Sequence, residues 1–191
     1  MSPQKEKFIM TIPNGLTAGT WNLDTSHSEV GFTVRHAGIS KVRGTFDDVH
    51  AVMNVTENIE NSTIEATVKT DSFNSKDSNR DAHVKGPDFF DIAQFPEMTF
   101  SSTGLSGDDE NYVLAGDLTI RGVTKPVEFN TEFNGVAVDP FGATRAGFSG
   151  QTVISRKDFG LTYNAALEAG GVLIGDKVTI SLDAAFVAPA E

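Results

Sequence analysis

Histidine is the side chain best suited to acid–base or metal chemistry in this sequence, which contains His27, His36, His50 and His83. Their spacings of 9, 14 and 33 residues include no pair at the i, i+4 spacing of a helical metal site. The chain has no cysteine, which excludes disulfides, thiol nucleophiles and thiolate metal sites. Any site must therefore use oxygen or imidazole groups, and we expect no metal and no cofactor.

A nucleophile and a base could be assembled from Ser78, Asp81 and His83. However, the alternating Gly, x, Ser, x, Gly motif of a hydrolase nucleophile elbow is missing from the chain. We favour a structural role, in which Arg80 and Asp81 form an ion pair or a cap at the start of a short helix. We predict no catalytic residue and expect that the protein is not an enzyme.

These side chains belong to an irregular stretch, residues 79–100, with the sequence NRDAHVKGPDFFDIAQFPEMTF. Its charge, its two prolines and the adjacent Phe89 and Phe90 interrupt segments that otherwise alternate apolar and polar residues. A loop exposed to water would normally be polar, so these phenylalanines must pack downward or form a gate. We expect this stretch to plug, cover or open a β-barrel.

The elements that position this stretch are strands, because apolar residues recur at every second position along the chain. Such runs occupy residues 30–34, 64–68, 114–120, 127–133 and 178–182. The period slips between Phe46 and Val49, which predicts a bulge at Asp47 and Asp48. Turns are expected at Gly38, residues 57–61, 107–111 and 122–125, Asn134 with Gly135, and Gly170 with Gly171.

Eight or nine strands, with short helices in residues 77–90 and near 156–161, predict an all-β antiparallel barrel or sandwich. An eight-stranded barrel can be filled by side chains or left open for one small ligand. Small residues at inward positions indicate open space: Ala51, Ala66, Gly116, Ala146, Gly150 and Ala184.

A chain of 191 residues suits one domain, which we place at residues 19–189 after a flexible N-terminal arm, residues 1–18. The formal charge of −11 argues against nucleic acid and anionic membrane surfaces as partners, and we expect no stable membrane insertion. The N-terminus has only the short apolar run 8–10, which predicts no signal peptide and a cytoplasmic location.

Five blocks resemble the YceI-like family, bacterial lipocalin-like proteins associated with polyisoprenoid binding. They are TWNLDTSHSEVGFTVRHAG at 20–38, NRDAHVKGPDFFD at 79–91, FPEMTFSST at 95–103, GDLTIRGVTKPV at 116–127 and RKDFGLTYN at 156–164. The resemblance implies an eight-stranded, antiparallel, lipocalin-like barrel and a homodimer. It further implies a tunnel that holds a long isoprenoid chain, such as a polyprenol or the tail of an isoprenoid quinone.

The inward phase of the strands predicts which residues would contact that ligand: Phe32, Val34, His36, Met53, Val68, Phe100, Leu118, Phe129, Phe148 and Ile180, with Phe89 and Phe90 at the mouth. Inside an apolar interior, His36 should need a hydrogen-bond partner. Two alternatives stay open. One is a structural or interaction barrel with a filled core, and the other is an enzyme that acts on a lipid-like substrate through Asp81, His83 or His36.

Overall fold

The computed structural model describes residues 10–108 and 110–189 of the chain. In this part the elements are β1 (Gly19–Leu23), η1 (Thr25–His27), β2 (Glu29–His36), β3 (Ser40–Phe46), β4 (Val49–Val55), η2 (Ile59–Asn61), β5 (Thr63–Lys69), η3 (Thr70–Ser72), β6 (Phe73–Asn74), α1 (Ser78–Lys85), β7 (Glu97–Asp108), β8 (Asn111–Ile120), β9 (Val123–Val138), β10 (Thr144–Ser155), η4 (Arg156–Phe159) and β11 (Ile174–Val187). The η elements are single turns of 3₁₀ helix.

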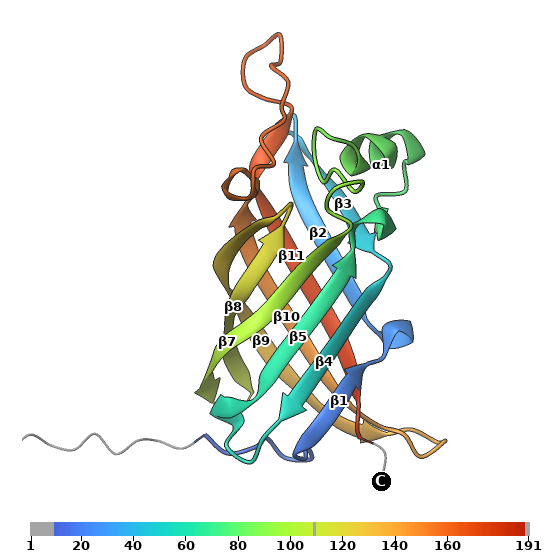
Figure 1. Cartoon of the computed structure of the whole chain (residues 1–191), viewed down its shortest axis with the longest axis vertical. Helices are drawn as coiled ribbons and strands as arrows, with labels where there is room; N and C mark the ends of the chain where they lie inside the picture. The colour runs from blue at the N-terminus through green and yellow to red at the C-terminus, as the bar shows by residue number, and fades with distance from the viewer. Residues whose placement is uncertain (1–9, 109, 190–191) are drawn as a thin grey trace, which may run out of the picture.

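The strands form a closed antiparallel barrel with eight positions around its circumference (Figure 1). Their order is β1, β4, β5, β7, β8, β9, β10 and β11, and β11 pairs back with β1. At three of these positions the strand consists of two separate segments. β1 and β2 both pair with β11, one after the other along its length. Beside them, β3 pairs with β2 beyond the end of β4, and β6 pairs in turn with β3. The predicted eight-stranded barrel is confirmed, and so are both predicted short helices.

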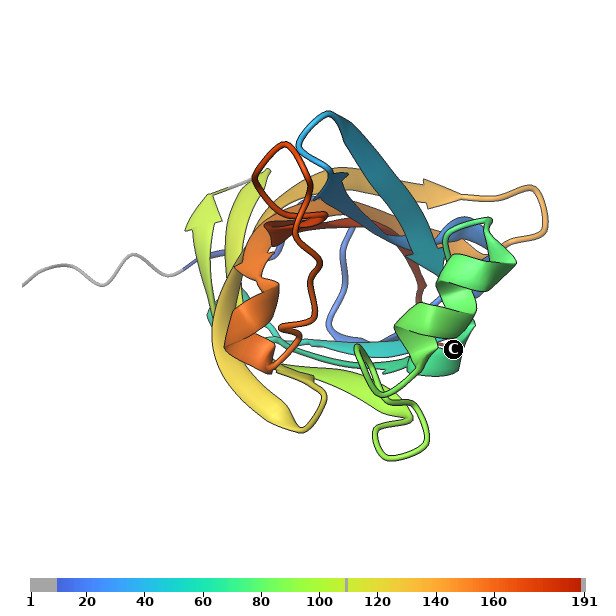
Figure 2. The same cartoon turned by 90° about the horizontal axis from the view of Figure 1, so that it is seen from above.

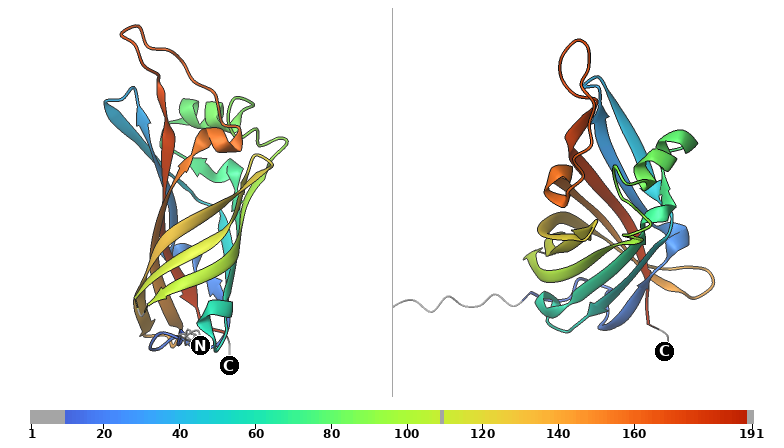
Figure 3. Two further views of the ribbon diagram at one scale, coloured as in Figure 1. Left: turned by 90° about the vertical axis from the view of Figure 1, so that its left-hand side faces the viewer. Right: turned by 45° about the horizontal axis from the view of Figure 1, so that its top comes forward.

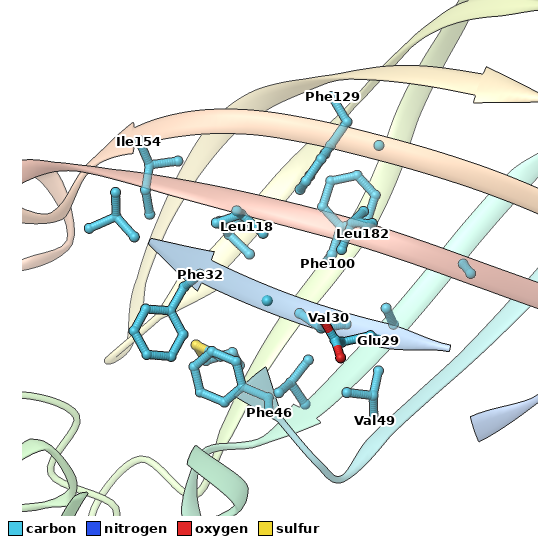
Figure 4. Close-up of a pocket in the computed structure, with 18 of the residues that line it drawn as sticks. Glu29, Val30, Phe32, Phe46, Val49, Phe100, Leu118, Phe129, Ile154 and Leu182 are labelled. Carbon is cyan, nitrogen blue, oxygen red and sulfur yellow. The ribbon is translucent and has the colours of Figure 1, made fainter. Parts of the chain in front are cut away.

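The phase slip at Asp47 and Asp48 is a strand break, not the predicted bulge inside one strand. β3 ends at Phe46 and pairs with β2, whereas β4 begins at Val49 and pairs with β1. Two residues outside the ladder restore the inward phase, so that Phe46 and Val49 both line the interior (Figure 4).

A second correction concerns Asn134 and Gly135, which the sequence predicts to be a turn. They lie inside β9, opposite the point where the register with β10 shifts between Gly147 and Phe148. Gly135 has φ +114°, a conformation that favours glycine and suits a bulge. The bulge increases the coiling of two long strands, and so helps the sheet to close.

The end of the barrel that lies at the bottom of Figure 1 is closed by apolar packing. Leu16 and Trp21 are buried there with Phe186, and the indole Nε1 of Trp21 donates to the carbonyl of Thr17 at 2.9 Å. The predicted arm therefore divides: residues 1–9 lie outside the described residues, whereas residues 10–18 include buried side chains against this end.

The opposite end, the mouth, is flanked by α1 on one side and by residues 160–173 on the other (Figure 2). Asp77 caps α1 by accepting from the backbone N–H groups of Asn79 and Arg80. The sequence predicts that Arg80 and Asp81 form an ion pair or a cap. In the structure they do not pair with each other, and each one binds Ser75 instead. Ser75 thus fixes α1 to the end of β6.

Candidate functional site

The barrel encloses a cavity of about 880 Å³ that extends from the closed end to the mouth. That volume lies in the upper part of the range for small-molecule sites in proteins. Its wall is built mainly from the inward side chains of alternate strand positions, as Figure 4 shows for Val30, Phe100, Leu118 and Leu182. The sequence pattern of period two therefore becomes a continuous apolar lining.

Every residue predicted to contact a ligand lines this cavity: Phe32, Val34, His36, Met53, Val68, Phe89, Phe90, Phe100, Leu118, Phe129, Phe148 and Ile180. Their role in binding stays a prediction. Other side chains, which the strand pattern did not predict, also line the cavity, among them Phe46, Phe73, Ile154 and Tyr163. Phe73 lies in a two-residue strand and Tyr163 in a loop, so neither belongs to a run long enough to show a period.

The small inward residues fall into two groups. Ala51, Ala66, Gly150 and Ala184 line the cavity and leave it open. Gly116 and Ala146 are not among the lining residues, which corrects the expectation that they leave free space. A Cβ at Gly116 would overlap the ring of Phe100, so the absent side chain makes room for an aromatic ring.

Two groups of aromatic rings line the cavity. Phe32 and Phe73 are stacked with ring centroids 4.9 Å apart, and Phe46 meets Phe73 edge to face at 5.7 Å. On the part of the wall formed by β7, β8 and β9, Phe100 and Phe129 meet edge to face at 5.5 Å. Such rings present flat apolar surfaces and few hydrogen-bonding groups to a guest.

Three rings form a constriction across the mouth, which we call the mouth triad: His83, Phe89 and Tyr163. The centroid of His83 lies 5.2 Å from that of Phe89 and 4.9 Å from that of Tyr163, and the last two are 5.2 Å apart. His83 belongs to α1 and Tyr163 to the segment on the other side of the mouth. The triad therefore joins the two elements that flank the opening.

A buried arginine holds the second of these elements in place. The guanidinium of Arg156 donates to the carbonyl oxygens of Gly175, Leu161, Tyr163 and Ile174 at distances of 2.6 to 3.2 Å. Burial lowers the pKa of Arg156, and this is opposed by the charge of Asp176. Because its fork of donors binds carbonyl oxygens on both sides of residues 164–173, it ties the base of that loop to the barrel.

The polar groups of the cavity do not assemble a catalytic arrangement among the described residues. The imidazole of His36 makes no hydrogen bond there, so the predicted partner is not found. Asp81 is bound to Ser75, and the carboxylate that reaches His83 is that of Asp88, with Nε2 to Oδ2 at 2.9 Å. That pair is about half exposed at the rim.

The described residues contain no group of three or more His, Asp or Glu side chains placed to hold a metal ion. Within the same ranges, no helix is both long enough and apolar enough to span a bilayer.

Residues 21–186 match the description of a YceI-like domain. A UPF0312 protein of Staphylococcus aureus is 37% identical over 169 residues, which cover 87% of this chain and 96% of that protein. A UPF0312 protein of Photorhabdus laumondii is 37% identical over 160 residues, covering 76% and 83%.

Solved structures share the fold. The YceI protein of Campylobacter jejuni has a TM-score of 0.69 and 31% identity, covering 88% of this chain and 97% of its own. BcnA of Burkholderia cenocepacia has a TM-score of 0.74 and 21% identity, covering 87% and 99%. A polyisoprenoid-binding domain from Saccharophagus degradans has a TM-score of 0.69 and 14% identity, covering 88% and 98%.

Proposed function

Because this chain belongs to the YceI-like family, we propose that its barrel binds and sequesters or carries a long-chain isoprenoid lipid, either a polyprenol or an isoprenoid quinone. The observation that carries the proposal is the apolar cavity of about 880 Å³ inside a closed barrel. The similarity to the Saccharophagus degradans domain, which binds polyisoprenoid, supports the same class of ligand.

The lining suits a chain that is recognised by length and not by polar groups. Transfer of each methylene group from water gives roughly 0.8 kcal/mol, so several isoprene units can be held without an ion pair. Phe89 and Phe90 at the mouth and Phe32, Phe100 and Phe129 within would contact successive parts of the tail.

The two alternatives account for less of this geometry. A structural barrel with a filled core would not contain a cavity of this size. An enzyme would need an acid paired with a base in the cavity, whereas the imidazole of His36 makes no hydrogen bond among the described residues and the His83–Asp88 pair is about half exposed at the rim. We therefore propose a binding protein without catalytic activity.

The test is extraction of protein purified from its native host with organic solvent, followed by mass spectrometry for prenyl lipids. Added isoprenoid quinone at about 100 times the dissociation constant should stabilise the fold by about 2.7 kcal/mol, a rise in melting temperature of roughly 5 to 10 °C. Repeated absence of prenyl lipid, together with no thermal shift, would refute the proposal.

Gly150→Leu is the variant that should block the cavity. A Cβ at Gly150 would have ordinary contacts of 3.5 Å with Leu182 and Thr131, so the larger side chain can be accommodated and extends into the bore. We expect the thermal shift by quinone to disappear while the barrel still folds. The matched control is Gln151→Leu, which adds leucine at the next, exposed position and should leave binding unchanged.

We also propose that the protein is a homodimer and is cytoplasmic. Sedimentation equilibrium of the full chain tests the first point, since a dimer has twice the 20.4 kDa mass of the chain. Fractionation of host cells followed by detection with an antibody tests the second.

A further inference from the structure

The outer face of the β2–β3 hairpin carries three exposed cations, Arg35, Lys41 and Arg43, which we call the hairpin patch. Arg35 and Lys41 lie directly opposite each other in the register, and Arg43 is the next outward residue of β3. Among the described residues, none of the three side chains makes an ion pair or a hydrogen bond. Like charges at opposed positions destabilise a sheet, so this arrangement calls for an anionic partner outside the chain.

Charge is distributed unevenly along the barrel, although the chain as a whole carries −11. At the closed end, the loops between β4 and β5, β7 and β8, and β9 and β10 contain Glu57, Glu60, Glu110 and Asp139, and Asp108 is the last residue of β7. Arg145 is the basic residue of the described chain at that end, and the other described Lys and Arg residues lie on segments toward the mouth. The mouth end also carries carboxylates, and several of them have partners within the chain: Asp77 caps α1, Asp81 binds Ser75, Asp71 binds Lys85, Asp88 binds His83, Glu97 binds Lys69 and Asp176 binds Ser155.

Two large apolar side chains project beyond these cations. Ile39, at the tip of the β2–β3 hairpin, is 88% exposed, and Val172, in the loop before β11, is 52% exposed. The backbone N–H of Ala37 donates to the carbonyl of Leu173 at 2.7 Å, which joins the hairpin to that loop. Figure 3 shows both segments extending past the rim of the barrel.

We propose that the mouth end docks on the surface of an anionic lipid bilayer. Ile39 and Val172 enter the boundary between headgroups and acyl chains, and the hairpin patch lies at the level of the phosphates. Apolar side chains ahead of a band of Lys and Arg match the order of layers in a membrane interface, which an acidic protein surface does not offer. This inference rests on the proposed function, since docking would turn the open end of the cavity toward membrane lipid.

The first test measures binding of the full chain to vesicles of phosphatidylcholine mixed with phosphatidylglycerol, and to vesicles of phosphatidylcholine alone, by flotation. We expect binding to the anionic vesicles that weakens with added salt. The triple variant Arg35→Gln, Lys41→Gln and Arg43→Gln should bind about 100-fold more weakly, at about fivefold for each cation. Failure of the unaltered chain to bind the anionic vesicles would overturn the proposal.

A matched control separates the patch from net charge. Thr63→Glu, Asn111→Asp and Asn130→Asp lower the net charge by the same three units on exposed positions of β5, β8 and β9, away from the hairpin. This control should bind the anionic vesicles nearly as well as the unaltered chain. An equal loss of binding in both triple variants would show that net charge alone governs the effect, and would contradict docking through the hairpin.

A second pair of substitutions tests the bilayer against an acidic protein as partner. Ile39→Ser with Val172→Ser should reduce vesicle binding about tenfold and leave binding to soluble polyglutamate unchanged. If polyglutamate bound as tightly as the vesicles and these serines had no effect, the patch would be a protein interface and the proposal would be wrong.

Loading of a prenyl quinone from ethanol separates the two proposals. It should be equal in the unaltered chain, in the Ile39→Ser with Val172→Ser variant and in the control with three added carboxylates, because none of these residues lines the cavity. If loading failed in every protein while anionic vesicles still bound, the proposed function would fall and the docking would stand.

Discussion

Glycine decides how closely two aromatic rings approach the barrel wall. Phe32 lies opposite Gly44 in the register, and Phe100 covers Gly116. A side chain on either glycine would occupy the space of the ring. The rings in turn bury the backbone of the adjacent strand, an arrangement known to offset the weak packing of glycine in sheets.

At Gly44, alanine should destabilise the barrel. Its Cβ would lie 2.5 Å from the carbonyl oxygen of Asn74 and 2.6 Å from the ring of Phe32, so we expect a loss of about 1–3 kcal/mol in unfolding free energy. Urea denaturation measures this loss. The control is Gly104→Ala, where no atom lies within 4 Å of the new Cβ and little change is expected. Equal stability of the two variants would contradict the close packing at Gly44.

Short connecting elements fix the ends of the barrel through charged hydrogen bonds. Asp24 caps η1 by accepting from Ser26, and it also accepts from Nε of Arg145 at 2.8 Å, which ties η1 to β10. These hydrogen bonds, those of Ser26 first and that of Arg145 next, hold the pKa of Asp24 well below its usual range. Arg145 binds Asp139 as well, so one guanidinium joins three elements.

The hydrogen bonds that Asp24 accepts from Ser26 and Arg145, which we call the Asp24 clip, make the stability of the fold depend on pH. The pKa of Asp24 is lower in the folded state than in the unfolded chain, so the clip stabilises the fold fully above about pH 5 and less as the pH falls. Asp24→Asn should cost about 1–2 kcal/mol at pH 7 and flatten the decline in unfolding free energy below pH 5. Urea titrations from pH 7 to pH 3 measure both effects.

Asp117→Asn, at an exposed carboxylate without a hydrogen bond to another described residue, serves as the control for the Asp24 clip. Its pH profile should match that of the unaltered chain. A steep acid decline that persisted in Asp24→Asn would assign the effect to other carboxylates.

At the mouth, the triad of His83, Phe89 and Tyr163 joins α1 to the facing loop, so we expect it to control access to the cavity. Tyr163→Ala should open this constriction and raise the rates of ligand entry and release about tenfold each, with little change in affinity. Stopped-flow fluorescence with a fluorescent prenyl analogue measures both rates. Phe141→Ala, which removes a 95% exposed ring at the far end, should leave them unchanged. Unaltered rates in Tyr163→Ala would place the entrance elsewhere.

For the molecule as a whole, the bore has a fixed volume and is closed at one end. It should therefore limit the length of the isoprenoid tail that the barrel can hold. Affinity should increase at least tenfold for each added isoprene unit while the tail fills the bore, since each buried methylene gives roughly 0.8 kcal/mol. It should then reach a plateau, because about 880 Å³ are available. Titration with a series of prenyl quinones of increasing length tests this. A rise without a plateau would contradict an enclosed site.

The distribution of charge over the whole molecule changes what composition alone suggests. A net charge of −11 predicts repulsion from anionic surfaces, yet Arg35, Lys41 and Arg43 share one exposed face near the mouth. Net charge is a sum over the chain, whereas attraction within a Debye length depends on the charges that face the surface.

The sequence by itself determined the barrel and most of its lining. Alternation of apolar and polar residues assigns each side chain to one face of a strand, so Phe32, Leu118 and Ile180 could be placed inside without coordinates. The same local rule misread Asp47 with Asp48 and Asn134 with Gly135, because a strand break, a bulge and a turn leave similar traces in a sequence.

Only the tertiary structure decided which small residues leave space and which are covered. Gly116 and Gly150 occupy similar inward positions, but a ring from the neighbouring β7 fills the space beside Gly116. Tertiary contacts likewise brought together Tyr163 and His83, and the four carbonyls around Arg156. The physical reason is that a period records the direction of a side chain, whereas free volume and contacts depend on what residues distant in sequence place against it.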